Sequence, residues 1–218
     1  MRKTSYVVTF FLVVISLTLN ILAITRSDWL IDNGRELIYN RTVVRYGLLQ
    51  RCERRVMRIP DASGDWHNVY TDFECRDFPK SVSDHCDEEN RLFCAEWTSA
   101  GYSAQLGVGY GVLALLALLV GVSTHSRRRR VWKAVAGLVT LNALFSMIAF
   151  IIVTDLFRTS GLPDFTYTQL GPAWFVSLLS WLFSFLVVFG VIWTGKAADK
   201  GHKWAAGNRA YSRIADRP

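Results

Sequence analysis

Charge is missing from four long stretches of this 218-residue sequence, at residues 5–25, 101–124, 134–154 and 173–194. Each stretch supplies about the 20 apolar residues that a helix needs to cross a hydrocarbon core of roughly 30 Å. In lipid the backbone must satisfy its own hydrogen bonds, which favours helices over single strands. The segregation of apolar residues argues against a soluble globule, and a hydrophobic content of 51% excludes a disordered chain.

The absence of ionisable residues inside these stretches also argues against a pump or a coupled transporter, because such proteins use charged side chains at membrane depth. The polar residues there, other than serine and threonine, are Asn20, Gln105 and Asn142. We expect Asn20 and Asn142 to form hydrogen bonds across helices, and Gln105, near the end of its stretch, to face water.

Motifs for catalysis and metal binding are missing as well. The sequence contains no H-E-x-x-H, no G-x-S-x-G and no P-loop, and its four histidines are far apart. The acidic residues of segment 84–89 are interpreted as a solvated surface rather than a cation site. We therefore expect no enzyme activity, no catalytic residue, no cofactor and no bound metal.

Basic residues are distributed unevenly between the segments that separate the apolar stretches. Segments 1–4, 125–133 and 195–218 together contain 13 basic and two acidic residues, whereas segments 26–100 and 155–172 contain 12 basic and 16 acidic residues. The positive-inside rule therefore places both termini in the cytosol. This topology explains the net charge of +7 without any nucleic-acid partner.

The first apolar stretch has a rival interpretation as a secretory signal peptide, because Arg2 and Lys3 precede it. It is longer than a usual signal-peptide core, and no small-residue cleavage site follows, so we predict a retained helix. The predicted order is a cytosolic N-terminus (1–4), a first span (5–25), an extracellular loop (26–100), a second span (101–124), a basic cytosolic loop (125–133), a third span (134–154), a second extracellular loop (155–172), a fourth span (173–194) and a basic cytosolic tail (195–218).

All four cysteines, Cys52, Cys75, Cys86 and Cys94, lie in the large predicted extracellular loop. Cysteines confined to that side indicate disulfides formed in an oxidising compartment. Zinc binding is the alternative, but the sequence has no C-x-x-C pair and the spacings fit no zinc finger. Four cysteines allow three connectivities, of which we favour the sequential pairing.

The same loop contains a glycosylation sequon at Asn40 and several segments of high β propensity. Asn40 lies on the side that the charge count assigns to the exterior, which favours its glycosylation. The predicted strands are 36–40, 42–49, 55–59 and 66–73, with a turn at 60–64 and a lead into the second span at 91–100.

Small residues recur along the second span. Gly107 and Gly111 form a G-x-x-x-G pair, and Ala114 continues it at helical spacing. Such faces let helices approach closely. We expect this face to pack within the chain, with a contact between copies as the alternative.

Two features of the large loop resemble the claudin and peripheral-myelin-protein superfamily of four-span proteins. Trp29 follows the first span, and Gly47-Leu48-Leu49-Gln50-Arg51-Cys52 is similar to the family's Gly-Leu-Trp-x-x-Cys segment. Leu49 stands where the family has its second tryptophan, and Cys75 lies further on than the family's second cysteine. The long, cysteine-rich loop is most similar to that of fungal claudin-like membrane proteins.

The resemblance implies a mainly α membrane protein: a left-handed bundle of four transmembrane helices with a small, disulfide-braced extracellular antiparallel β-sheet. It implies that Cys52 and Cys75 form the family disulfide. It also implies that the second extracellular loop adds an edge strand, around residues 164–169.

The predicted function is contact with other proteins, in membrane organisation, at the cell surface or in adhesion. The alternative is an auxiliary subunit of a channel, receptor or sensor complex, and a channel or transporter acting alone ranks last. The expected partners are the lipid bilayer and other membrane proteins, including further copies of the chain. The expected location is the plasma membrane, reached by the secretory pathway, with an endomembrane as the alternative.

Overall fold

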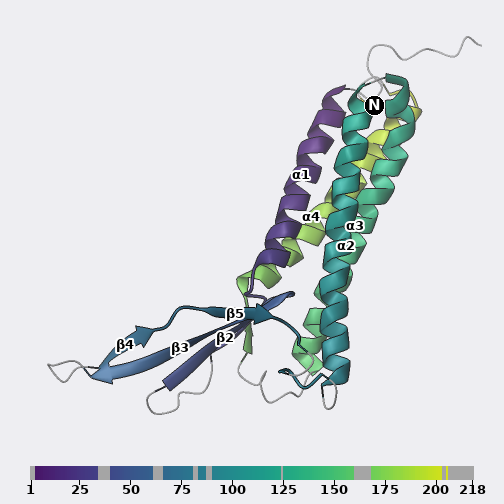
Figure 1. Ribbon diagram of the computed structural model, residues 1–218. Helices are drawn as coiled ribbons and strands as arrows, with labels where there is room; N and C mark the ends of the chain where they lie inside the picture. The colour runs from purple at the N-terminus through teal and green to yellow at the C-terminus, as the bar shows by residue number, and fades with distance from the viewer. Residues whose placement is uncertain are drawn as a thin grey trace, which may run out of the picture.

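A computed structural model describes residues 3–33, 40–60, 66–80, 83–86, 90–123, 125–159, 168–202 and 205. These residues form four long helices and six strands (Figure 1). The helices are α1 (Lys3–Thr25), α2 (Arg91–Ser123), α3 (His125–Thr159) and α4 (Pro172–Asp199). The strands are β1 (Leu30–Asp32), β2 (Asn40–Tyr46), β3 (Gln50–Pro60), β4 (Trp66–Tyr70), β5 (Glu74–Asp77) and β6 (Thr168–Leu170).

Each predicted span lies almost entirely within one helix, and all four helices are long and apolar enough to cross a membrane. All four begin or end beyond the predicted spans, and α2 and α3 do so by the most residues. Residues 91–100 form the first turns of α2, and residues 125–133, which we predicted as a loop, begin α3. Neither segment contains proline or glycine, and leucine, alanine and arginine are strong helix formers, so the helices continue past the apolar residues.

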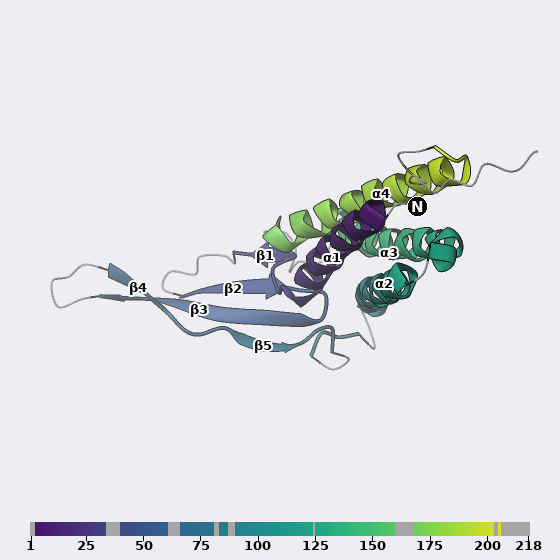
Figure 2. The ribbon, with the colours of Figure 1, turned by 90° about the horizontal axis from the view of Figure 1, so that it is seen from above.

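The four helices lie side by side, and the sheet stands at one end of them (Figure 1). The start of α1, the junction of α2 with α3 and the end of α4 all lie at the opposite end. At the sheet end, α2 and α3 extend past α1 and α4. The strands leave the helices sideways, so that a view from above the bundle shows the sheet broadside (Figure 2).

The sheet has the strand order β4-β3-β2-β1-β6, with β5 also paired to β3, and all pairs are antiparallel. Strands β2, β3 and β4 overlap the predicted strands, whereas β1 and β5 were not predicted. The predicted edge strand of the second loop appears as β6, which pairs with β1. Residues 36–39, 61–64 and 164–167, which carry further predictions, lie outside the described residues.

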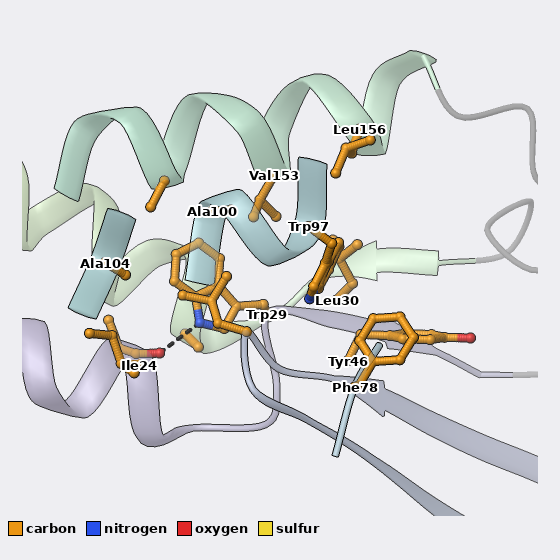
Figure 3. Close-up of a cluster of buried hydrophobic side chains, with 14 of the residues drawn as sticks. Ile24, Trp29, Leu30, Tyr46, Phe78, Trp97, Ala100, Ala104, Val153 and Leu156 are labelled. Carbon is orange, nitrogen blue, oxygen red and sulfur yellow. Dashed lines mark hydrogen bonds between the residues drawn. The ribbon is translucent and has the colours of Figure 1, made fainter. Parts of the chain in front are cut away.

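A buried apolar cluster joins the sheet to the helices (Figure 3). Trp29 and Trp97 are at most 1% exposed and lie at its centre. The indole Nε1 of Trp29 donates to the carbonyl of Ala23 at 2.6 Å, and that of Trp97 donates to the carbonyl of Gly47 at 3.2 Å. Each tryptophan thus buries its ring and also satisfies its polar atom, as a buried indole requires.

Candidate interaction surfaces of the sheet

Two disulfides brace the part of the chain between α1 and α2, with the sequential pairing that we favoured. Cys52 on β3 is bonded to Cys75 on β5, directly opposite in the strand register. Cys86 is bonded to Cys94 in the first turns of α2. No cysteine is left free to bind zinc.

The motif residues that carry the resemblance to claudins lie where the sheet meets the helices. The backbone N–H of Trp29 donates to the carbonyl of Tyr46 at 2.9 Å and so continues the β1–β2 ladder. Leu48 is 1% exposed in the junction cluster, and Cys52 is 2% exposed. Gly47 has no room for a side chain, because a Cβ there would lie 2.7 Å from the Cα of Ser27. Trp29 and Gly47 therefore attach the sheet to the end of α1, while the Leu48 carbonyl lies beside Gly101 of α2.

Asn40, the predicted glycosylation site, is the first residue of β2 and is paired with Met57 in the strand register. Its glycosylation stays a prediction.

The polar residues of the spans form a buried network between three helices. Asn20 Nδ2 on α1 donates to Asn142 Oδ1 and to Ser146 Oγ on α3, at 2.7 Å in both cases. The hydroxyls of Ser16 on α1 and Ser184 on α4 are 2.6 Å apart. Gln105, by contrast, is exposed. Asn20 and Asn142 thus bond across helices, and their polar atoms find partners within the chain.

The small residues of α2 face this network. A Cβ at Gly107 would lie 3.1 Å from Ser146 Oγ, and one at Gly111 would lie 3.0 Å from Leu17 Cδ1. Ala114 is fully buried. The G-x-x-x-G face therefore packs against α1 and α3 of the same chain.

Two ion pairs hold the segments that flank the sheet. Arg26 Nε donates to Asp28 Oδ1 at 2.9 Å, and this hydrogen bond holds the pKa of Asp28 below its usual value. Arg76 Nη1 on β5 donates to Asp84 Oδ2 at 2.8 Å. Burial alone would raise the pKa of Asp84, but the hydrogen bond from Arg76 and that from the Lys80 backbone N–H keep it lowered.

The two faces of the sheet differ in charge and follow from the alternation of side chains along each strand. One face, here called the arginine face, carries Val43, Arg45, Arg54, Val56 and Tyr70. The other, here called the mixed face, carries Thr42, Glu53, Arg55, Met57, Ile59, Val69 and Glu74.

On the arginine face the guanidinium groups stack on aromatic rings. Arg45 lies 4.5 Å from the centre of the Phe73 ring, and Arg54 lies 4.8 Å from the centres of both the Phe73 and Tyr70 rings. Neither arginine forms an ion pair with a residue in the described part of the chain, and the Nε atoms of both lack a hydrogen-bond partner there. Stacking fixes each guanidinium, and the described acid that acts on either of them is Asp28, whose pKa Arg45 helps to lower from beyond ion-pair distance.

The mixed face combines exposed apolar side chains with a charged hollow. Met57, Ile59 and Val69 are 37%, 48% and 44% exposed, and Met57 pairs with Val69 across β3 and β4. Beside them lies a hollow of about 460 Å³, whose lining residues include Glu53, Arg55 and Glu74. Exposed apolar side chains beside charged groups of both signs make the mixed face a candidate surface for binding another protein.

Among the described residues, no group of three histidine, cysteine, aspartate or glutamate side chains is placed to hold a metal ion. No protein-family model matches the chain, and no curated protein matches it in sequence. The resemblance to claudins therefore stays a prediction.

Proposed function

We propose that the protein is a claudin-like, multi-pass membrane protein that acts by binding other proteins through the mixed face of its sheet. In this proposal the four helices cross the plasma membrane as a left-handed bundle, after passage through the secretory pathway. Both termini are cytosolic and the sheet is extracellular. The unequal charge of the two ends supports this orientation, because the basic segments 1–4, 125–133 and 195–218 adjoin helix ends at the side away from the sheet.

The observation that carries the proposal is the apolar group of Met57, Ile59 and Val69, held in the open on a disulfide-braced sheet. Burying apolar surface is the main favourable term in protein association. Strand β3, which carries Met57 and Ile59, is bonded to β5 by this disulfide and pairs with β2 and β4 on its two sides, so these side chains have little conformational entropy left to lose on binding. The mixed face therefore has both the chemistry and the rigidity of a binding surface.

The interior of the helices supports binding over transport. Asn20 and Asn142 are 3% and 1% exposed, and each forms hydrogen bonds to side chains of other helices. The polar side chains that could bind a solute inside the spans are therefore already engaged in hydrogen bonds between helices.

A pair of adjacent substitutions on β4 tests the binding surface. The full-length protein, tagged and expressed in its native cells, is cross-linked and purified in mild detergent, and its partners are identified and quantified by mass. Val69→Lys should reduce recovery of the partners by at least about tenfold, as expected for a charge placed in an apolar contact. Asn68→Lys, one residue away and facing the other side, should leave recovery unchanged. Equal recovery from both variants and the native protein would contradict the proposal.

Epitope tags test the orientation. Tags at the N-terminus and within residues 213–218 should bind antibody only after permeabilisation, whereas a tag within residues 61–64 should bind it on intact cells. A glycosidase-sensitive mass that Asn40→Gln removes would place β2 in the secretory lumen. A terminus that is labelled from outside would overturn the proposed topology.

A further inference from the structure

The arginine face is directed toward the side of the sheet from which α1 arrives. Trp29 and Gly47 stand opposite each other, one step beyond the Leu30–Tyr46 pair, and so share the face of Arg45. The Trp29 indole reaches back to Ala23 in the last turn of α1, and the Cβ direction of Gly47 points to Ser27.

The mixed face is directed the opposite way. The ring of Tyr46, whose side chain lies on that face, packs on Phe78 with ring centres 5.5 Å apart. Phe78 in turn packs on Phe93 and Trp97, in the first turns of α2. These turns extend beyond the ends of α1 and α4 (Figure 1). The mixed face therefore points away from the bulk of the helices, and the arginine face points back toward it.

The arginine face also lies close to the level at which the helices end. Strand β1 begins at Leu30, five residues after α1 ends at Thr25. Five residues of chain span at most about 17 Å. The strands then run sideways, across the helix direction (Figures 1 and 2). If α1 and α4 end at a membrane surface, the arginine face extends over that surface, within reach of the lipid head groups.

The chemistry of the face fits that position. Arginine binds phosphate through a planar fork of donors, and it does so best when the fork is held in place. Stacking on Phe73 and Tyr70 holds Arg45 and Arg54 in this way. Tyr70 is 56% exposed, and tyrosine is enriched at the level of the head groups.

We propose that the arginine face binds the phosphate groups of lipids in the same membrane that the helices cross, through Arg45 and Arg54, so that the sheet lies against the head groups. This inference rests on the proposed membrane-spanning arrangement. An acidic segment of another protein is the other ligand that the positive charge of this face could bind. The direction of the face favours the head groups, because the face is turned to the membrane side and away from free solution.

Fluorescent labels on adjacent β4 residues test the inference. All four native cysteines are in disulfides, so a single introduced cysteine is the only reactive thiol. Asn68→Cys places a label on the arginine face, and Val69→Cys places one on the mixed face. The full-length protein is reconstituted into nanodiscs of phosphatidylcholine with phosphatidylserine that contain a head-group nitroxide lipid. Quenching should be several-fold stronger at position 68 than at position 69.

Neutral variants on the two faces test the role of the arginines. Arg45→Gln together with Arg54→Gln should abolish the difference between the two labels, whereas Arg55→Gln, on the mixed face, should preserve it. Formation of both disulfides, measured by mass, shows that the variants have folded. The comparison of positions 68 and 69 in the native background does not depend on these variants.

Three results would overturn the inference. Equal quenching at the two positions, or stronger quenching at 69, would show that the arginine face is not at the head groups. Protection of position 68 from both the lipid nitroxide and aqueous iodide would show that protein covers the face instead. A Leu119→Cys label on α2 that an acyl-chain nitroxide fails to quench would overturn the membrane-spanning arrangement itself. Quenching at Leu119 without a difference between 68 and 69 would remove only the lipid contact.

Discussion

The helices and the sheet differ in the charge of their polar side chains and in how those side chains are paired. Between the helices the buried polar groups are neutral, and Asn20, Asn142 and Ser146 bond to one another. In the sheet, β2 and β3 alone carry six arginines and one glutamate, and Arg45 and Arg54 form no ion pair with any described residue.

The difference follows from the surroundings that each region is proposed to have. A polar group in lipid has no water with which to form hydrogen bonds. Polar atoms there must therefore be few, neutral and hydrogen-bonded within the protein. A sheet at the membrane surface can leave a guanidinium or an apolar strip uncovered until a partner arrives. The comparison supports the proposal that the helices hold the protein together while the sheet binds its partners.

The largest expected effect is on the sheet's covalent brace. Cys52→Ser should lower the free energy of unfolding by about 3 kcal/mol, and Cys86→Ser by about 2.5 kcal/mol, because the Cys52–Cys75 bond closes the longer loop. Thermal unfolding in detergent measures both, with a Cys86→Ser/Cys94→Ser double variant as the control for a stranded thiol. A larger loss of stability from Cys86→Ser would show that the Cys86–Cys94 disulfide stabilises the fold more than the disulfide within the sheet.

The next largest effect concerns the ion pair beside the sheet. Asp84→Asn should lower the free energy of unfolding by about 2 kcal/mol at neutral pH, because it removes a charge-assisted hydrogen bond to Arg76. Asp77→Asn is the matched control, since the Asp77 side chain is 90% exposed and its contact with Lys80 is 4.0 Å long. Equal losses of stability from the two variants would mean that the hydrogen bond between Asp84 and Arg76 contributes nothing beyond an exposed ion pair.

The effect of Asp84 has a defined pH dependence. Its folded pKa is lowered, so its contribution is present above the unfolded value of about 3.9 and is lost as the pH falls through the folded value. The difference in melting temperature between the native protein and Asp84→Asn should therefore shrink as the pH is taken from 7 to about 3. A difference that stays constant over this range would contradict the assignment.

A smaller effect is expected from the neutral network between the helices. Asn142→Leu should destabilise the protein by about 1 kcal/mol, the usual scale for such hydrogen bonds between membrane helices. Gln105→Leu, at an exposed position on α2, should change little. Partner binding should follow the abundance of the folded protein. Reproducible solute flux in liposomes that Asn142→Leu eliminates at normal abundance would favour transport over binding.

The smallest effect on stability is expected on the mixed face. Val69→Lys should change the free energy of unfolding by less than about 0.5 kcal/mol, because the residue is 44% exposed. Chemical unfolding monitored by tryptophan fluorescence would measure this. Loss of partner binding without loss of stability would separate the contact function of the sheet from its folding. A large destabilisation would show instead that Val69 is part of the fold.

Several elements could be predicted from local pattern alone. The four helices follow from apolar stretches without charge, and β2 to β4 follow from β-branched and aromatic residues. Strand β1 was missed because it has three residues and is held by its neighbours, with the Trp29 N–H and the Tyr46 carbonyl extending its ladder. The helical start of α3 was not predicted, because we took the basic residues of segment 125–133 to lie outside the helix. Basic residues limit the apolar part of a helix but not the helix itself.

The candidate surfaces could be predicted only in part. The segment 51–58 contains four arginines in eight residues, but the stacking of Arg45 and Arg54 on Phe73 joins residues that are 28 and 19 positions apart. Trp97 is fully buried in the cluster that joins the sheet to the helices, although it lies in a segment that the sequence marks only as a lead into the second span. No local pattern distinguishes these roles, because each depends on which strand lies opposite.

The sequence by itself determined the number of apolar helices, the segregation of charge and the group of cysteines available to one another, because each is a property of composition within a short window. Only the tertiary structure decided which residues share a face of the sheet and which way each face points. Strand register sets the first, since a shift of one residue exchanges the two faces. The packing of Trp29 against α1 and of Tyr46 and Phe78 against α2 sets the second, and that packing brings together residues that are distant in the chain.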